Sequence, residues 1–447
     1  MQRQFLLLSL YLPAVFGSLL ENTSSSQARL ENLENLLRHR FNASRRHDAN
    51  ITAKYVVRDF VRDSFEQYGL DVVMHDFPTR KPEFTGTNVI GILNGQRAGT
   101  PKDRLVLLGA HYDTADSTPG VDDNGSGMAL LLETARALTS QCQPEYTILF
   151  VAFDYSENTL SWAGDPCYWD VPCGSQRFVE DWLFSFLSQR GYPVFQGAYI
   201  ADTVMNWDNG IDTQAFSGTF SILFEDTYKR IQNNSFRGDF LFTYSREQDS
   251  VLVDAFTAHY NAQDGANFRI ESLTLPIVDQ PTAVDKRLYR AQLNSDHHNF
   301  WRTGVSFNAV QLTDSANFRG DMQLCHHRGC DDVTQITPQK LTFLTKITKS
   351  VVDTLANLSN ITYHCRDTNE DNPLEKSTEN LSYHSTPAVP PTEKPDRAKE
   401  RTTKAPKVSN PAKAVSSANG MTSRTINFVL TICVTIAHVI TRLTLER

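Results

Sequence analysis

The stretch FVAFDYSENTL, residues Phe150–Leu160, decides how this sequence is interpreted. Its first four residues form an apolar run that predicts a buried strand. The strand ends in polar residues, among them Glu157, and Ser156 stands directly before that glutamate. Because ligands of open α/β sheets bind beyond the ends of the strands, a carboxylate at this exit indicates a functional site.

Strand-like and helical patterns alternate over the part of the chain assigned to one domain, residues 25–365. Apolar runs typical of strands lie at 87–93, 104–112, 146–153, 197–201 and 305–312. Helical periodicity marks residues 31–40, 127–138 and 340–358. Strands that alternate with helices predict an α/β fold, with a mostly parallel central sheet and helices on both faces.

Length and charge limit the functions that this chain can have. Its 447 residues can form two or three average domains, or one large α/β domain with appendages. The net charge of −8 gives no broad attraction for the phosphates of nucleic acid. We therefore expect no nucleic-acid partner.

Both ends of the chain have the composition of targeting segments. Residues 1–18 hold an early arginine and an apolar stretch, which predicts a cleaved signal peptide, with an N-terminal membrane anchor as the alternative. Residues 366–427 are rich in Ser, Thr, Pro and Lys, which predicts a disordered stalk. Residues 428–447 predict a GPI attachment signal, with a short membrane anchor or a plain tail as alternatives. We expect a protein of the cell surface that a lipid anchor holds on the plasma membrane.

Sequons and cysteines agree with secretion. N-glycosylation is predicted at Asn22, Asn42, Asn50, Asn233, Asn357, Asn360 and Asn380. Of seven cysteines, Cys433 lies in the C-terminal apolar tail. Short spacings favour the pairs Cys167–Cys173 and Cys325–Cys330, and Cys142–Cys365 follows by elimination. This connectivity is a hypothesis.

Polar residues at the ends of two predicted elements suit metal binding. In HYDT, His111 and Asp113 share one side of a strand, and the carboxylate can orient a metal-binding imidazole. By itself this pair is more often structural. GVDDNGSG, residues 120–127, leads into a helix and offers either a carboxylate ligand or a turn that caps the helix at Ser126.

More polar residues continue this pattern. Glu157 and Asp202 each follow an apolar run, Ser295-Asp296-His297 opens a helical turn, and His326-His327 lies between Cys325 and Cys330. Histidines and carboxylates that meet at one edge of a sheet suit a divalent metal ion, zinc foremost, in the mixed ligation typical of catalytic sites.

Taken in order, these motifs resemble a known family. HYDT, GVDDNGSG, VAFDxxE, a lone aspartate after a strand, SDHxxFW and CxHxxCD are similar to those of the secreted co-catalytic dizinc aminopeptidases, over about residues 50–360. Bacterial leucyl aminopeptidases typify this zinc exopeptidase fold, and glutaminyl cyclases share it. The resemblance implies two zinc ions: His111 and Asp202 hold one, Glu157 and His327 hold the other, and Asp123 bridges both.

The resemblance also implies supporting roles. Asp113 orients His111, Asp296 and His297 belong to the architecture of the site, and the Cys325–Cys330 disulfide pins the loop of His327. The peptide bond between Asp123 and Asn124 is expected to be cis, and Asn124 is expected to be too buried for glycosylation. His326 stands where the family has an aromatic residue and is interpreted as a loop residue. Asp122 is interpreted as a turn residue or as a residue that supports the ligands, and His298 receives no role.

One departure from the family concerns the proton shuttle. In the family a second carboxylate directly precedes the zinc-binding glutamate, whereas this sequence has Ser156 there. A serine hydroxyl is not a base near neutral pH, and losing a general base costs about 10²–10⁴-fold in rate. No residue is therefore assigned as catalytic. In a shifted register Glu157 would be the base and Asn158 a ligand, but an amide is a poor zinc ligand.

A second departure follows Glu157. The link to Gly174 is longer than in the family and holds Trp162, Tyr168 and Trp169. Because it begins beside a predicted ligand, we expect it at the rim of the pocket, with a surface hairpin as the alternative.

Three functions remain. The first is a cell-surface zinc exopeptidase, most simply an aminopeptidase of reduced activity on peptides with free N-termini. The second is a non-catalytic zinc-binding relative that serves as an extracellular binding module. The third is acyl transfer of the glutaminyl cyclase type, which Ser156 also disfavours.

Overall fold

The computed structural model describes residues 28–46, 50–79, 83–115, 118–141, 143–157, 173–302, 304 and 306–361. The chain divides into two units, Met1–Asn369 and Glu370–Arg447, and every described residue belongs to the first. The predicted signal peptide, stalk, C-terminal segment and aromatic link after Glu157 lie outside the described residues. None of the helices within the described ranges has the length and apolar character that crossing a membrane requires.

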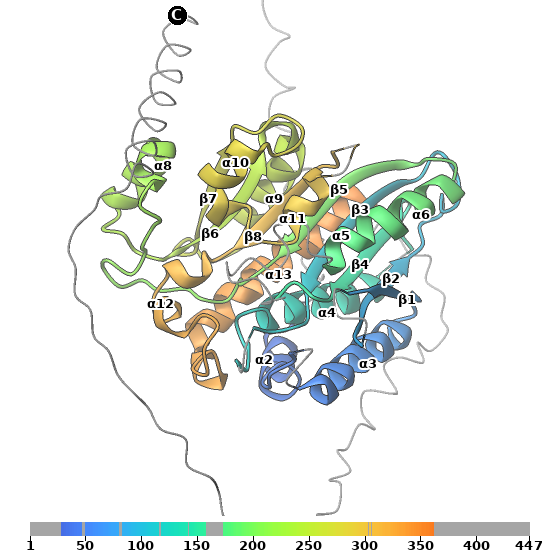
Figure 1. The fold of residues 1–447 in the computed structure, drawn as a ribbon, viewed down its shortest axis with the longest axis horizontal. Helices are drawn as coiled ribbons and strands as arrows, with labels where there is room; N and C mark the ends of the chain where they lie inside the picture. Colours follow the sequence, from blue (N-terminus) through green and yellow to red (C-terminus); the bar gives the residue numbers. More distant parts are fainter. Residues whose placement is uncertain are drawn as a thin grey trace, which may run out of the picture. The chain divides into compact units, whose positions relative to one another are not determined.

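A single mixed sheet organises the described residues (Figure 1), and its strand order is β1-β2-β4-β3-β5-β8-β6-β7. The strands are β1 (Asp71–Pro78), β2 (Thr85–Leu93), β3 (Arg104–His111), β4 (Ile148–Phe153), β5 (Val194–Ala201), β6 (Phe240–Arg246), β7 (Arg269–Leu275) and β8 (Ala309–Thr313). The four central strands β4, β3, β5 and β8 run parallel. Strands β1 and β2 pair antiparallel, as do β6 and β8. The predicted mostly parallel sheet is confirmed, although β1, β6 and β7 were not predicted.

Helices cover both faces of the sheet, as predicted. One face packs against α2 (Leu30–His39), α3 (Ile51–Gln67), α4 (Gly125–Thr139), α9 (Ser250–Ala262) and α13 (Pro338–Leu358). The other face packs against the π-helical turn Phe178–Leu183, which continues α5 (Gly174–Arg177), and against α6 (Phe184–Gln189), α7 (Phe220–Leu223), α8 (Glu225–Asn233) and α11 (His297–Arg302). Alternate strand residues point into the two cores: Leu108 lies in the first and Leu107 in the second. Burial on both faces explains why the central strands are apolar throughout.

The start of α4 differs from the sequence expectation. The helix is capped by Asn124, whose side-chain oxygen accepts a hydrogen bond from the Gly127 amide at 3.1 Å. The alternative of a cap at Ser126 is wrong, because Asn124 is the cap and the Ser126 hydroxyl donates to the Asp122 carbonyl at 2.7 Å. The fully buried Asn124 also donates to the carbonyl of Ala201 at 2.9 Å, which ties the helix to the end of β5. The expected cis peptide bond between Asp123 and Asn124 is present.

The expectations about cysteines and glycosylation have mixed outcomes. The Cys325–Cys330 disulfide is confirmed, and Cys173 is also disulfide-bonded. Cys142, Cys167 and Cys365 lie outside the described residues, so their pairings stay predictions. The sequon asparagines Asn42, Asn50, Asn233, Asn357 and Asn360 are exposed, and Asn22 and Asn380 lie outside the described residues.

Candidate metal centre

One group of donor atoms stands at the carboxyl ends of two central strands. His111 is the last residue of β3, Asp202 follows β5, and Asp123 lies in the turn before α4. His111 Nε2 is 3.5 Å from Asp123 Oδ1 and 3.5 Å from Asp202 Oδ1. The three donor atoms lie within 4.8 Å of one another, so they can hold one metal ion. We call these residues the strand-borne group.

A second group comes from the disulfide loop that follows α12 (Met322–Cys325). His327 Nε2 lies 3.0 Å from Asp123 Oδ2 and 3.3 Å from Glu157 Oε2. His326, interpreted from the sequence as a loop residue, is also close, with its Nδ1 3.3 Å from Asp123 Oδ2. We call His326 and His327 the loop-borne group.

The shared carboxylate of Asp123 joins these groups. Its Oδ1 faces His111 and its Oδ2 faces His327. The structure therefore brings together all five residues predicted as ligands, His111, Asp123, Glu157, Asp202 and His327. Their roles as ligands stay a prediction.

Asp113 holds the exits of β3 and β4 together. Its carboxylate accepts hydrogen bonds from the amides of Ser156 and Glu157, at 3.1 and 2.9 Å. The same carboxylate lies 3.5 Å from His111 Nδ1, and the Asp113 carbonyl lies 3.2 Å from that nitrogen. Burial would raise the pKa of Asp113, but the hydrogen bond and charge of His111 lower it. Asp113 is thus positioned to orient His111, as the resemblance implied.

Asp331, which sequence analysis left without a role, ties the disulfide loop to the turn before α4. Its carboxylate accepts from the amides of Asp122 and Asp123, at 2.8 and 3.1 Å. Burial raises its pKa to about 8. The last residue of the CxHxxCD motif was the sequence signal for this contact. Asp122 lies in this turn, and its Oδ1 accepts a hydrogen bond from the Met205 amide at 3.1 Å.

Arg45, from the segment after α2, supports the same turn and was not predicted. Its guanidinium donates to the carbonyls of Tyr112, Pro119 and Gly120, at 2.8, 2.8 and 2.9 Å. The side chain is fully buried, and burial lowers its pKa to about 10. The Arg45 guanidinium thereby fixes three backbone carbonyls that lie close in sequence to the metal-donor residues His111 and Asp123.

Ser156, at the position of the family's proton shuttle, faces Asp296. Its hydroxyl lies 2.7 and 2.9 Å from the two carboxylate oxygens of Asp296, to which it donates, and the Ser175 hydroxyl donates to the same carboxylate at 2.5 Å. Burial raises the pKa of Asp296 to about 6. Asp296 therefore lies behind Ser156, and its role in the architecture of the site stays a prediction. His297 and His298 are buried in α11, where burial lowers both pKa values.

The shifted register finds no support in the position of Glu157. Its Oε2 lies in the cluster, 3.3 Å from His327 Nε2, as a ligand would. Asn158, the ligand in that register, lies outside the described residues.

Unpaired buried atoms indicate that a cation fits this cluster. Within the described ranges, Asp123 Oδ2, Glu157 Oε2 and His326 Nδ1 are buried without a hydrogen-bond partner. Buried polar atoms normally have one, and buried carboxylates need a compensating positive charge. Burial would lower the pKa of His327, but the charges of Glu157 and Asp123 raise it to about 11, which reflects a strongly negative potential. Imidazole and carboxylate donors in such a potential suit zinc.

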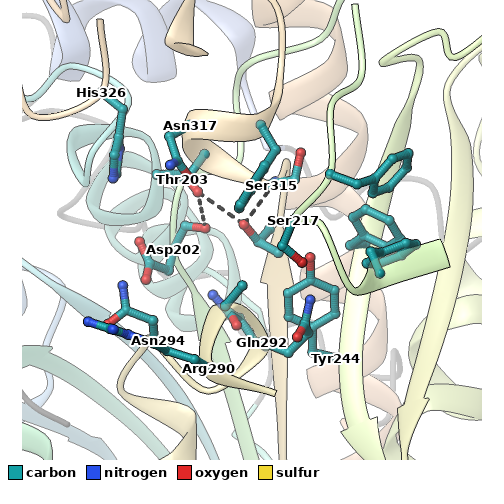
Figure 2. Close-up of a pocket in the computed structure, with 18 of the residues that line it drawn as sticks. Asp202, Thr203, Ser217, Tyr244, Arg290, Gln292, Asn294, Ser315, Asn317 and His326 are labelled. Carbon is teal, nitrogen blue, oxygen red and sulfur yellow. Dashed lines mark hydrogen bonds between the residues drawn. The ribbon is translucent and has the colours of Figure 1, made fainter. Parts of the chain in front are cut away.

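A cavity of about 440 Å³ opens beside the cluster. Its polar end is lined by Asp123, Glu157, Asp202, His326 and His327. The remainder is lined by polar residues such as Gln214, Arg290 and Asn294 together with five aromatic side chains: Phe216, Phe220, Phe242, Tyr244 and Phe318. Figure 2 shows Asp202 and Thr203 on one side and Tyr244 on the other, with Gln292 between them. The cavity can therefore take an amino-acid side chain next to the donor atoms.

Sequence comparison gives a family for part of the chain. Residues 88–208 match the sequence model of peptidase family M28. This range contains His111, Asp123, Glu157 and Asp202 but not His327. The uncharacterized protein YfbL of Escherichia coli is 27% identical over 293 residues, which are 63% of this chain and 75% of that protein. The aminopeptidase YwaD of Bacillus subtilis is 40% identical over 73 residues, only 16% of this chain and 15% of that protein.

Structural comparison supports the fold. The glutaminyl cyclase of Macrostomum lignano matches with a TM-score of 0.50 at 17% identity, covering 77% of this chain and 93% of that chain. At this identity the likeness shows a shared fold and nothing of the chemistry.

Proposed function

Because residues 88–208 match the model of peptidase family M28, we propose that the chain is a zinc-dependent hydrolase of the aminopeptidase type, with weak activity. The observation that carries this proposal is the shared carboxylate of Asp123 between two sets of donors. His111, Asp202, Glu157, His327 and the shared Asp123 would hold zinc there, and bound zinc would supply a Lewis acid for a scissile carbonyl and for water.

The chain's own residues would supply binding and orientation. The cavity would receive the side chain of the substrate's N-terminal residue, against walls that include Phe242 and Tyr244. Asp113 and Asp331 would keep the donor-bearing turns fixed through their hydrogen bonds. Peptides with a free N-terminus are the proposed substrates.

The proposed weakness of the activity follows from Ser156. Its hydroxyl already donates its proton to Asp296, and a serine hydroxyl does not take up another proton near neutral pH. The missing general base predicts a rate about 10²–10⁴-fold below that of a relative with a carboxylate at this position. The same hydrogen bond favours one alternative, a zinc-binding extracellular module without catalysis.

A direct test compares the full-length chain with Ser156→Glu on a panel of aminoacyl amides, after zinc per chain has been measured. We expect two zinc ions, slow cleavage by the wild type, and faster cleavage by Ser156→Glu. In that variant two adjacent carboxyl groups would share a proton, which raises the pKa of the new base. Ser156→Ala is the matched control and should keep the wild-type rate.

Each outcome separates the alternatives. Cleavage by the wild type at the rate of Ser156→Glu would refute the proposed weakness. An inert wild type that binds two zinc ions, with activity gained by Ser156→Glu, would favour the non-catalytic module. Failure to bind zinc would overturn the ligand assignment.

We also propose that the protein acts at the cell surface through a GPI anchor. The apolar residues 1–18, the exposed sequon asparagines and the Cys325–Cys330 disulfide support secretion, since disulfides persist in oxidising compartments. Phosphatidylinositol-specific phospholipase C should release the full-length chain from intact cells. Retention on the treated cells would contradict a GPI anchor.

A further inference from the structure

We propose that His326 is an additional metal ligand at the position of the loop-borne group, between Asp123 Oδ2 and His327. We call this the second metal position, and the position of the strand-borne group the first. The second position would then use a residue outside the five-ligand set that the family resemblance implies. The inference rests on the proposed zinc-dependent function.

The geometry of three donor atoms carries the proposal. His326 Nδ1 and His327 Nε2 lie 3.3 and 3.0 Å from the same oxygen, Asp123 Oδ2. All three atoms lie within 4.8 Å of one another, which is the spacing that one bound cation allows. The two imidazole rings stack with centroids 3.8 Å apart, so that both present a nitrogen to the same carboxylate.

The contact between His326 and Asp123 is not a hydrogen bond. Among the described residues, His326 Nδ1 and Asp123 Oδ2 are both buried atoms without a hydrogen-bond partner, although only 3.3 Å separate them. A histidine that served only to stack would gain by turning this nitrogen to water, and 19% of its side chain is exposed. A shared cation accounts for the buried nitrogen and the buried oxygen together.

The backbone of the disulfide loop explains how two adjacent histidines reach one point. Consecutive side chains of an extended chain point to opposite sides. Here the sequence separation of the two cysteines is only 5, and His327 has a left-handed φ of 58°. That conformation is rare for a residue with a side chain, and it turns the chain so that both imidazoles face Asp123.

The added donor would make the two metal positions unequal. The second position would have four protein donors, Asp123, Glu157, His326 and His327, the number typical of structural zinc sites. The first position keeps three, His111, Asp123 and Asp202, the number typical of catalytic sites. Substrate would then meet the metal cluster chiefly at the strand-borne group.

The first test counts histidine ligands in the unaltered protein. The full-length chain, with ¹⁵N-labelled histidine and loaded with ¹¹³Cd in place of zinc, is measured by NMR for coupling between the metal and imidazole nitrogens. We expect three coupled histidines, one of them through Nδ1. Two coupled histidines, neither through Nδ1, would overturn the proposal without any variant.

The second test measures affinity in His326→Phe, which keeps an aromatic ring in the stack. Native mass spectrometry during competition with a zinc chelator should show that the variant loses one ion at about 10–100-fold lower chelator concentration than the wild type does. The other ion should be lost at the wild-type concentration. His39→Phe is the matched control, because His39 is exposed on α2 and should leave both ions in place. Unchanged affinity in His326→Phe would overturn the proposal.

These readouts are separate from activity. A wild type with three coupled histidines that cleaves no aminoacyl amide would refute the proposed hydrolase and leave the role of His326 intact. A wild type that cleaves these amides but shows only two coupled histidines would support the hydrolase and refute the role of His326. Absence of metal binding would overturn both.

Discussion

The strand-borne and loop-borne groups hold their donors in different ways. His111 and Asp202 stand at the ends of β3 and β5, which pair in parallel, and their side chains are 2% and 14% exposed. His327 stands on a loop closed by one disulfide, and its side chain is 36% exposed. The folded sheet fixes the positions of the strand-borne donors. The positions of the loop-borne donors depend on the Cys325–Cys330 disulfide that closes their loop. We therefore expect the two metal positions to respond differently to substitution.

The largest effect should come from Asp123→Asn, because Asp123 serves both groups. Removing its negative charge should weaken both metal positions by more than about 100-fold and abolish hydrolysis. Zinc per chain, measured by native mass spectrometry, checks this. The neighbouring Asp122→Asn is the control, since its side chain accepts from the Met205 amide. Retention of one ion by Asp123→Asn would show that the carboxylate is not shared.

Asp113→Asn should come next, and it tests whether the groups are coupled. An asparagine keeps one acceptor oxygen, so one of the amides of Ser156 and Glu157 would face an NH₂ group. We expect an affinity loss of about 10–100-fold at both positions. Chelator competition measures this loss, and the exposed Asp63→Asn is the control. An effect on a single position would mean that Asp113 supports only one group.

Asp296→Asn tests how the free energy of unfolding depends on pH. The pKa of Asp296 is raised from 3.8 to about 6 by burial, so the folded state binds more protons than the unfolded state between these values. The free energy of unfolding should therefore fall as pH rises through this window, by about 3 kcal/mol in total. The variant should lack this decrease. Urea unfolding at several pH values checks it, and parallel curves for the two proteins would contradict it.

The smallest effect should follow removal of the disulfide in the double variant Cys325→Ser with Cys330→Ser. Opening so short a loop should cost about 2 kcal/mol of unfolding free energy. Zinc affinity should fall at the second position and stay unchanged at the first, which serves as the internal control. Urea unfolding and native mass spectrometry measure the two effects. Equal losses at both positions would remove the distinction between the groups.

The sequence predicts the parts of the site that end apolar runs. His111, Glu157 and Asp202 were identifiable because a buried strand stops where each stands, or just before it. Strands β1 and β7 escaped prediction because they are the edges of the sheet and mix charged with apolar residues. Strand β6 escaped because it is wholly buried yet carries polar residues such as Thr243.

The supporting contacts were harder to predict because they join distant parts of the chain. Asp331 binds amides 208 and 209 residues away, and the CxHxxCD motif marks this aspartate but does not identify its partners. His326 was interpreted as a loop residue by comparison with the aromatic residue of the family. Its approach to Asp123 depends on the backbone turn at His327, which local sequence does not encode.

Arg45 has a consequence for biosynthesis. Its guanidinium binds the carbonyl of Ala43 nearby, but its three other carbonyl partners belong to residues 67 to 75 positions later in the chain. At a synthesis rate of about 5–20 residues per second, the arginine emerges roughly 4 to 15 seconds before its last partner. During that interval its segment has no native partner in this turn. The Arg45 guanidinium can therefore complete its hydrogen bonds only after the turn before α4 has been translated.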